Sequence, residues 1–377
     1  MKLLRVWAMA RKEFIHVLRD PRSLGMGIAI PMIMLLLFGY ALTLDVDNVP
    51  LVIWDQNPSR ASREFVSRFL GSRYFSLQGT VDRYSEIEKA IDSRRALVSL
   101  IIPPDFSGRL TSGHVAPVQM IVDGSDSNTA TIAMGYAEVI TAAYSQQIAL
   151  QTVQRLGGRP VPAPIDFRPR VWFNADLESR NYIIPGLIAV IMMVIAALLT
   201  SLTVAREWET GTMEQLISTP VKAPELVLGK LLPYFAIGLF DVLLAVLMGE
   251  YLFRVPMRGS AALIFGQAAI FLIGTLSLGM LISIVAKNQL LASQVAMVLT
   301  FLPAFLLSGF AYPIRSMPKV LQGITYLIPA KYFVTLLKGI YLKGVGPRVL
   351  FVEGLFLALF AVIMIFLANK KFRKKLA

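Results

Sequence analysis

The chain has 377 residues, of which 55% are hydrophobic and only 16% are charged, and it carries a formal net charge of +13. A soluble domain has about 25% charged residues, so this composition argues against a wholly soluble protein. Because cysteine is absent, a disulfide framework and thiolate chemistry are excluded.

The charge is unevenly distributed along the chain. Residues 45–181 contain 14 Lys+Arg and 15 Asp+Glu, which leaves 23 of the 37 basic and 9 of the 24 acidic residues elsewhere. The excess of positive charge therefore flanks the apolar runs, where Lys and Arg fix the topology of membrane proteins. A nucleic-acid binder would instead gather it on a soluble face, so nucleic acid is not expected as a partner.

The first predicted elements are membrane spans. A helix needs roughly 20 mainly apolar residues to cross a bilayer, and the first candidate is too long for the apolar core of a signal peptide. The sequence predicts six spans, at 24–44, 182–204, 227–250, 261–286, 290–311 and 348–368.

The basic ends of the chain predict its orientation. Residues 1–23 and the tail 369–377 are both rich in Lys and Arg, so both are expected in the cytoplasm. With six spans, the loop 205–226 is then cytoplasmic and residues 45–181 are extracytoplasmic. An inner-membrane location with both termini inside the cell follows.

Residues 45–181 alternate between short β-type runs and amphipathic helical runs, which predicts a compact extracytoplasmic α/β domain. Asp123-Gly124-Ser125-Asp126 is expected to be a turn with a helix cap, because it lacks the ligand pattern of an EF-hand. No catalytic constellation, cofactor motif or metal site is recognised, so we interpret the domain as a binding or docking module. Strands are expected at 49–54, 74–78, 96–102, 118–122 and 167–173, and helices at 59–70, 85–92 and 129–156.

The segment 312–347 is expected to be extracytoplasmic or re-entrant. Residues 321–342 are apolar, but Pro329, Lys331 and Lys338 interrupt them. A seventh span would also place the basic tail outside the cell. We therefore favour a re-entrant helix pair over a span, because irregular backbone is tolerated at membrane depth when protein surrounds it.

Two predicted cytoplasmic elements point toward a partner. The N-terminal segment is amphipathic at helical spacing: Leu3, Trp7, Ala10, Phe14 and Val17 fall on one face, and Arg5, Lys12, His16 and Arg19 on the other. It can serve as a membrane anchor or as a connector to a cytoplasmic subunit.

The second element is a short acidic helix within the loop 205–226. Thr212 followed by Gln215 predicts a capping box at its start, and Thr219-Pro220 predicts its end. A helix this short needs a surface to pack on, although an ordinary turn between spans is the alternative.

These residues also carry a family resemblance. Arg206-Glu207-x-Glu209-x-Gly211-Thr212-x-Glu214-x-Leu216 resembles the signature loop of ABC-2 type transporter permeases. Leu307-Ser308-Gly309-Phe310-x-x-Pro313, with Pro329 and Tyr332 beyond it, resembles the family's motif after the fifth span. The N-terminal Arg-Lys-Glu-Phe and Arg19-Asp20-Pro21-Arg22 agree, so the resemblance covers nearly the whole chain.

The resemblance implies a membrane all-α bundle with an inserted extracytoplasmic α/β domain. It implies an exporter subunit that pairs with a second permease and couples to a separate ATP-binding subunit. A periplasmic adaptor and an outer-membrane channel are possible further partners. The coupling-loop residues would be Arg206, Glu207, Glu209, Gly211, Thr212, Met213, Glu214 and Leu216, and the interface helix would use Trp7, Arg11, Lys12 and Phe14.

Two further features bear on the energy source. The only dipeptide that suggests a phosphate-binding loop, Gly229-Lys230, has Pro224 in place of the first Gly and Leu231 after the Lys, so ATP hydrolysis by that route is excluded. Asp241 lies near the middle of the third span, where a carboxylate is a candidate functional group. The alternative function is therefore a secondary transporter that uses an ion gradient through Asp241.

Overall fold

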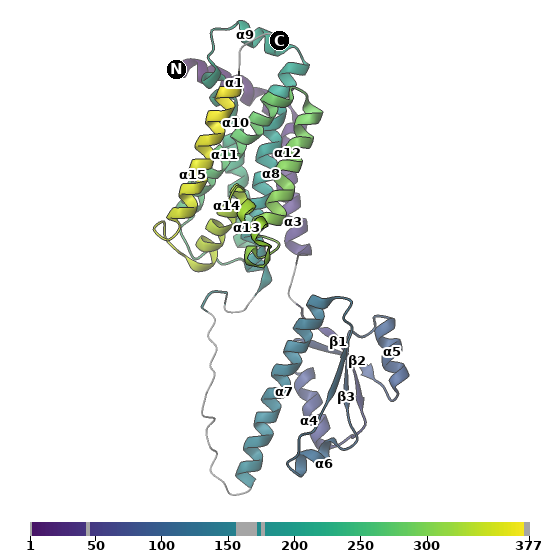
Figure 1. The fold of residues 1–377 in the computed structure, drawn as a ribbon. Helices are drawn as coiled ribbons and strands as arrows, with labels where there is room; N and C mark the ends of the chain where they lie inside the picture. The colour runs from purple at the N-terminus through teal and green to yellow at the C-terminus, as the bar shows by residue number, and fades with distance from the viewer. Residues whose placement is uncertain (1, 43–45, 156–171, 175–177, 373–377) are drawn as a thin grey trace. The chain divides into compact units, whose positions relative to one another are not determined.

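The computed structural model describes residues 2–42, 46–155, 172–174 and 178–372. The chain divides into two units (Figure 1). The helical unit consists of the described residues of Met1–Thr43 and Arg170–Ala377, and the sheet unit consists of those of Leu44–Pro169.

The helical unit contains long apolar helices and several short connecting ones. Its helices are α1 (Leu3–Arg19), α2 (Pro21–Leu24), α3 (Ile30–Ala41), α8 (Ser179–Glu209), α9 (Thr212–Ser218), α10 (Ala223–Leu247), α11 (Ala261–Ala286), α12 (Gln289–Leu307), α13 (Lys319–Thr325), α14 (Pro329–Lys338) and α15 (Phe351–Lys371). A single π-helical turn at Gly25–Ala29 joins α2 to α3. Similar turns extend α10 at Met248–Leu252 and α14 at Gly339–Lys343, and a 3-10 turn covers Ile314–Ser316.

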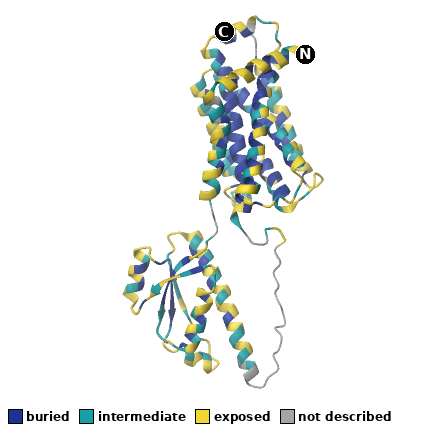
Figure 2. Cartoon of the chain, turned by 180° about the vertical axis from the view of Figure 1, so that it is seen from behind, coloured by how far each residue is buried: buried dark blue, intermediate teal, exposed yellow. Residues whose placement is uncertain are grey.

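Helix α8 is the centre of this unit. Every residue from Ile183 to Ala197 is buried, and Figure 2 shows the buried residues running through the middle of the bundle. A helix that is apolar on all sides is typical of a buried position. Helices α3, α10, α11, α12 and α14 pack around α8, and α15 packs against α11 and α14.

Five helices in the described residues are long and apolar enough to cross a membrane: Ser179–Glu209, Ala223–Leu252, Ala261–Ala286, Gln289–Leu307 and Phe351–Lys371. The first predicted span corresponds to a shorter apolar helix, Gly27–Ala41. The N- and C-terminal ends of the described chain lie at the same end of the helical unit, near α9 (Figure 1).

The segment predicted as a re-entrant helix pair does form two helices. Lys319–Thr325 and Pro329–Lys343 meet at an angle of 83°, and Pro329 occupies the first turn of α14, where a missing N–H is tolerated. The bend agrees with a re-entrant pair, although a broken span would have the same break.

Glycine permits the close packing of α11 on α8. A Cβ atom at Gly279 would collide with the carbonyl oxygen of Ala197 and the hydroxyl of Thr200. Neither neighbour can move away easily, because one is backbone and the other is fully buried. Small residues allow such close approach between membrane helices.

We therefore expect Gly279→Ala to destabilise the bundle by about 1–3 kcal/mol, the usual cost of overpacking. Gly266→Ala on the same helix is the matched control, since a Cβ there meets no atom within 4 Å. Thermal midpoints of the two detergent-solubilised variants measure the difference. Equal midpoints would show that α8 and α11 adjust without cost.

The sheet unit contains a four-stranded mixed sheet with helices on both faces. Its strand order is β2-β1-β3-β4, in which β1 runs parallel to β2 and β3, and β4 runs antiparallel to β3. The predicted strand at 167–173 lies largely outside the described residues. The elements are β1 (Val49–Asp55), α4 (Arg60–Leu70), β2 (Phe75–Thr80), α5 (Tyr84–Asp92), β3 (Val98–Ile102), α6 (Phe106–Thr111), β4 (Gln119–Val122) and α7 (Ser127–Arg155).

Alternate residues of β1 and β3 supply two separate cores. Leu51 and Leu100 pack with Phe65 of α4 and Tyr144 of α7, whereas Val52 packs on the other face with residues of α5. This is the period of two that a strand imposes on its side chains. The arrangement agrees with the α/β pattern predicted from the sequence, but α6 was not predicted.

The Asp123–Asp126 turn caps a helix, as the sequence predicts. Asp126 accepts hydrogen bonds from the backbone N–H groups of Asn128 and Thr129 and from the Thr129 hydroxyl. The hydroxyl bond is the main cause that lowers the pKa of Asp126 below its ordinary value. The carboxylate therefore stabilises the start of α7.

Candidate functional site

Helix α1 packs along α10 at the end of the helical unit that holds α9. Val6, Met9 and Val17 are buried on its inner face. A Cβ atom at Gly229 of α10 would lie 2.6 Å from the Met9 Cβ and 3.1 Å from the Val6 carbonyl oxygen. Glycine at this position therefore lets α1 pack directly on the backbone of α10.

The apolar face predicted for this helix is divided in the structure. Ala10 and Val17 are buried, but Leu3, Trp7 and Phe14 are 79%, 68% and 44% exposed. Helix α1 thus has two apolar surfaces. The inner one packs against the rest of the chain, and the outer one is exposed. Arg11, also predicted as an interface residue, is exposed.

A buried ion-pair cluster joins α1, α8 and α10. The Lys230 ammonium lies 3.3 Å from a carboxylate oxygen of Glu13 and 3.0 Å from one of Glu207. Lys12 donates to the same Glu207 oxygen at 3.2 Å, and the Tyr234 hydroxyl donates to Glu13 at 3.2 Å. Lys230 is only 1% exposed, so this cation is held almost wholly by carboxylates of two other helices.

A second pair of contacts lies beside this cluster. The Arg206 guanidinium is 3.2 Å from a carboxylate oxygen of Asp20 and 2.9 Å from the His16 Nε2. Arg206 precedes Glu207 on α8, so successive residues of one helix hold two parts of the N-terminal segment. The motif residues Arg206 and Glu207 therefore make their main contacts inside this chain.

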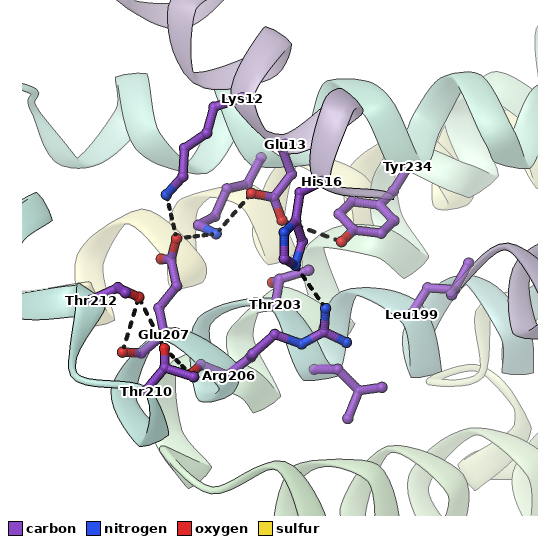
Figure 3. Close-up of a pocket in the computed structure, with 12 residues that line it drawn as sticks. Lys12, Glu13, His16, Leu199, Thr203, Arg206, Glu207, Thr210, Thr212 and Tyr234 are labelled. Atoms are coloured by element: carbon purple, nitrogen blue, oxygen red, sulfur yellow. Dashed lines mark hydrogen bonds and ion pairs between the residues drawn. The ribbon is translucent and has the colours of Figure 1, made fainter. Parts of the chain in front are cut away.

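These side chains surround a cavity of about 270 Å³ between α1, α8 and α10 (Figure 3). Its charged wall is formed by Lys12, Glu13, Arg206 and Glu207, and Leu199 lies on its apolar side. The second carboxylate oxygen of Glu207 is buried and has no partner among the described residues. Only one oxygen of the Glu207 carboxylate therefore has partners among the described residues, namely Lys12 and Lys230.

The N-terminus of α1 is also fixed to the first turn of α10 and to the loop that precedes it. The backbone N–H of Lys2 donates to Glu225 at 2.7 Å, and Arg5 lies 3.6 Å from the other oxygen of that carboxylate. Arg5 also donates to the Pro220 carbonyl at 2.6 Å. Helix α1 is thus attached at its start and at its middle to the chain segments on either side of α9.

Helix α9 is short, as predicted, but its start differs from the prediction. Its N-cap is Gly211, in the left-handed region at φ +73°, and no side chain caps the helix. The Thr212 hydroxyl contacts the Thr210 hydroxyl instead, at 3.0 Å. The predicted Thr212–Gln215 capping box is therefore wrong, because a left-handed glycine makes the turn into the helix and places Thr212 inside its first turn.

The two faces of α9 have different environments. Met213 and Leu216 are 1% and 8% exposed and belong to the core of the helical unit. Glu214 and Gln215 are exposed, and Thr212 is half-buried. Of the motif residues on α9, Glu214 is the one whose side chain is open to a partner.

The last turn of α8 is attached to the turn between α11 and α12. Glu209 accepts hydrogen bonds from the backbone N–H of Gln289, at 2.9 Å, and from the Gln289 side-chain amide. The Lys287 ammonium lies 4.6 Å from the centre of the Trp208 ring. The end of α8 thus contacts α12 as well as α1 and α10.

The motif after the fifth predicted span lies at the other end of the helical unit. Gly309, at φ +78°, presents a carbonyl oxygen that accepts from the Tyr182 hydroxyl at 3.1 Å and from Lys338 at 3.2 Å. Phe310 is buried against the bundle. The Leu307–Phe310 motif therefore fixes the link between α12, α8 and α14.

Asp241 of α10 is 2% exposed, and one of its carboxylate oxygens has no partner among the described residues. It is buried within a single copy of the chain and does not face an open path in this structure. It also lies outside the group of residues that line the charged cavity.

Several residues that make the contacts described above were not predicted as functional. Glu13, Lys230, Tyr234, Glu225 and Gln289 gain their partners only through the fold. In the sequence, Lys230 stands out only as part of a dipeptide that fails to match a phosphate-binding loop. A lysine within an apolar run was the available signal, since such a cation needs a partner at membrane depth.

Comparison with known proteins places these features in a family. A profile of ABC-2 family transporter proteins matches residues 21–370. The Escherichia coli protein named "Probable multidrug ABC transporter permease YbhS" is 40% identical over 99% of this chain and 97% of its own length. "Probable multidrug ABC transporter permease YbhR" is 33% identical over 90% of each chain. "Inner membrane transport permease YhhJ" is 26% identical over 86% of this chain and 85% of its own.

Proposed function

This chain belongs to the ABC-2 family of transporter proteins as a multi-pass ABC permease subunit, and we propose that it serves an exporter driven by a separate ATP-hydrolysing subunit. The observation that carries the proposal is the buried cluster of Lys230, Glu13 and Glu207. The cluster joins α1, α8 and α10. Helices α8 and α10 flank α9 in the chain, so a movement of α9 would be passed to the bundle through them.

The end of the helical unit that contains α1 and α9 is proposed to face the cytoplasm of a bacterium. The N-terminal segment and the C-terminal Lys370 and Lys371 supply cations on this side, in agreement with the positive-inside rule. The membrane is proposed to be the inner membrane, because the relative YhhJ is named an inner membrane transport permease. The sheet unit is then extracytoplasmic.

Helix α9 is proposed to be the coupling helix, with Glu214 as its main contact to the ATP-binding subunit. Met213 and Leu216 are buried, so their role is to anchor α9 to the bundle. A movement of α9 would then pass through Glu207 to α1 and α10. It would also pass through Glu209 to α12, which gives each motif carboxylate a separate role.

A second permease, identical or related, is proposed to complete the substrate path. Helix α12 exposes Met297, Val298 and Leu302 along one stretch, which supplies apolar surface for such a contact. Drug-like molecules are the proposed substrates, in line with the names of the YbhS and YbhR relatives. The sheet unit is proposed to bind a periplasmic adaptor of an efflux system that continues to an outer-membrane channel.

Two substitutions in the signature loop should have different effects. Glu214→Lys is expected to reduce the ATP-binding subunit that co-purifies with the chain about tenfold or more, because a reversed charge at a contact surface repels its partner. Glu209→Ala is expected to leave co-purification unchanged but to lower the drug resistance that the transporter confers on an efflux-deficient host. Mass spectrometry and ATPase assays of the purified complex measure the first effect.

The control is Glu88→Lys, an equally exposed carboxylate on α5, which should leave both readouts unchanged. If Glu214→Lys retains its full share of ATPase, α9 is not the docking element. If Glu209→Ala loses the partner as fully as Glu214→Lys, Glu209 is itself a contact residue and its bond to Gln289 is incidental.

A further inference from the structure

The sheet unit contains a second cavity, which is lined by residues of α4, α6 and α7. These helices cover one face of the sheet (Figure 1). The volume of the cavity is about 540 Å³, about twice that of the charged cavity in the helical unit. Ligand pockets of proteins have about 300–1,000 Å³. Its apolar wall includes Phe65, Phe106, Leu110, Val118, Ile148 and Val153.

The inner wall of this cavity is aromatic and rigid. The Phe65 ring lies 5.8 Å from that of Phe106 and 5.2 Å from that of Tyr144, measured between ring centres. All three residues are 5% exposed or less. The Tyr144 hydroxyl donates to the Ala61 carbonyl at 3.1 Å, so its polar atom is already bonded and its ring faces the cavity as an apolar surface.

The rim is fixed before any ligand binds. Gly113, at φ +73°, turns the chain after α6, and the His114 backbone N–H donates to the Arg109 carbonyl at 2.9 Å. The His114 ring Nδ1 lies 3.0 Å from the Ser112 hydroxyl. A rim held in this way favours binding, because little ordering remains to oppose it.

The chemistry of the lining selects for an uncharged ligand. None of the described residues that line the cavity is Asp, Glu, Lys or Arg, so the wall itself offers no counter-charge to an anion or a cation. The polar groups are the His114 ring and the hydroxyls of Thr141 and Ser145. A few such groups in an apolar wall are typical of sites that orient small molecules.

We propose that this cavity is a binding site for a neutral, mainly apolar small molecule with a ring system. The site lies in the sheet unit, whereas the helices contain the proposed transport path. It therefore does not depend on the function proposed above, and either can fail without the other.

The absence of cysteine allows a direct test on the full chain in detergent. Ser145→Cys places a single thiol in the cavity wall, and its alkylation rate is measured with and without N-phenylnaphthylamine, a neutral aromatic probe. We expect the probe to slow alkylation about tenfold, since such sites bury most of a ligand's surface. The anionic sulfonate analogue with the same rings should not slow it.

Two controls separate binding from non-specific effects. Ser85→Cys, exposed on α5 across the sheet, should react at one rate under all conditions. Adding Ala116→Trp to the Ser145→Cys variant should fill the cavity and abolish the effect of the probe, and gel filtration checks that this variant remains monodisperse.

Three results would overturn the proposal. The probe could leave the alkylation rate of the Ser145→Cys variant unchanged, or the sulfonate could protect the thiol equally well. The thiol could also be protected without any probe and become reactive when residues 156–171 are deleted. In that case the chain itself would fill the cavity.

Discussion

Replacing Lys230 with methionine is expected to destabilise the helical unit by about 3–5 kcal/mol, because removing one partner leaves buried charges uncompensated. Glu13 and Glu207 are 5% and 7% exposed, and each loses the ammonium that lies within 3.3 Å of it. Methionine approximates the length of the lysine stem, so a cavity adds little to the effect. The measurement is the temperature at which the monodisperse gel-filtration peak is lost.

Lys12→Met is the matched control for this variant. Lys12 contacts the same oxygen of Glu207, but its side chain is 51% exposed. Exposed ion pairs contribute at most about 1 kcal/mol, so its peak should persist to nearly the wild-type temperature. Adding Glu13→Gln and Glu207→Gln to Lys230→Met should recover part of the stability, because the uncompensated charges are then gone.

The same variants test the role proposed for the cluster in coupling. If the triple variant is as stable as the wild type but confers no drug resistance, the charges act in transport and not only in folding. A Lys230→Met protein as stable as the wild type would contradict the structure at this point. Lys12 can still pair with Glu207, but Glu13 would need a counter-charge that the described residues do not supply.

The sequence was sufficient to predict those parts of the fold that depend on local patterns. Long apolar runs predicted the helices around α8, and short β-type runs between amphipathic helical ones, such as residues 49–54, predicted the strands of the sheet unit. Helix α6 was missed because it has six residues and contains Gly108, which weakens a helical pattern. Its absence from the prediction also hid the cavity that it lines.

The charged cluster could not be predicted, because its members are far apart in the chain. Lys230 meets Glu13 only when α1 packs on α10 beside Gly229, and no local pattern records that contact. The motif resemblance identified Arg206, Glu207 and Glu209 as a group. The structure shows that these three residues bond within the chain, whereas Glu214 of the same motif is exposed.

Asp241→Asn is expected to raise the thermal stability of the detergent-solubilised protein. A carboxylate at the centre of a membrane helix costs about 2.5–3.5 kcal/mol in insertion measurements, and one oxygen of Asp241 has no partner among the described residues. Asparagine keeps the shape of the side chain while removing the charge. We therefore expect a gain of about 1–3 kcal/mol, at or below the cost of inserting the carboxylate, because the asparagine amide is itself polar and is buried in the same place.

Glu250→Gln is the control, since Glu250 lies near the end of the same span and is half-buried, where solvent or headgroups reach it. Its variant should match the wild type in stability. If Asp241→Asn is less stable than the wild type, a counter-charge or a bound cation must hold the carboxylate, and the expectation is wrong.

The drug resistance that the Asp241→Asn variant confers on an efflux-deficient host, compared with that of the wild type, tests whether Asp241 takes part in transport. A variant that is more stable but inactive would mean that the chain retains an unfavourable carboxylate for transport, which is the usual form of a trade-off between stability and activity. Loss of transport driven by a proton gradient, with no ATPase in the preparation, would favour the secondary-transporter alternative. A stable and fully active variant would instead mean that Asp241 is dispensable, and the energy for transport would have to enter through α9 and the Lys230 cluster alone.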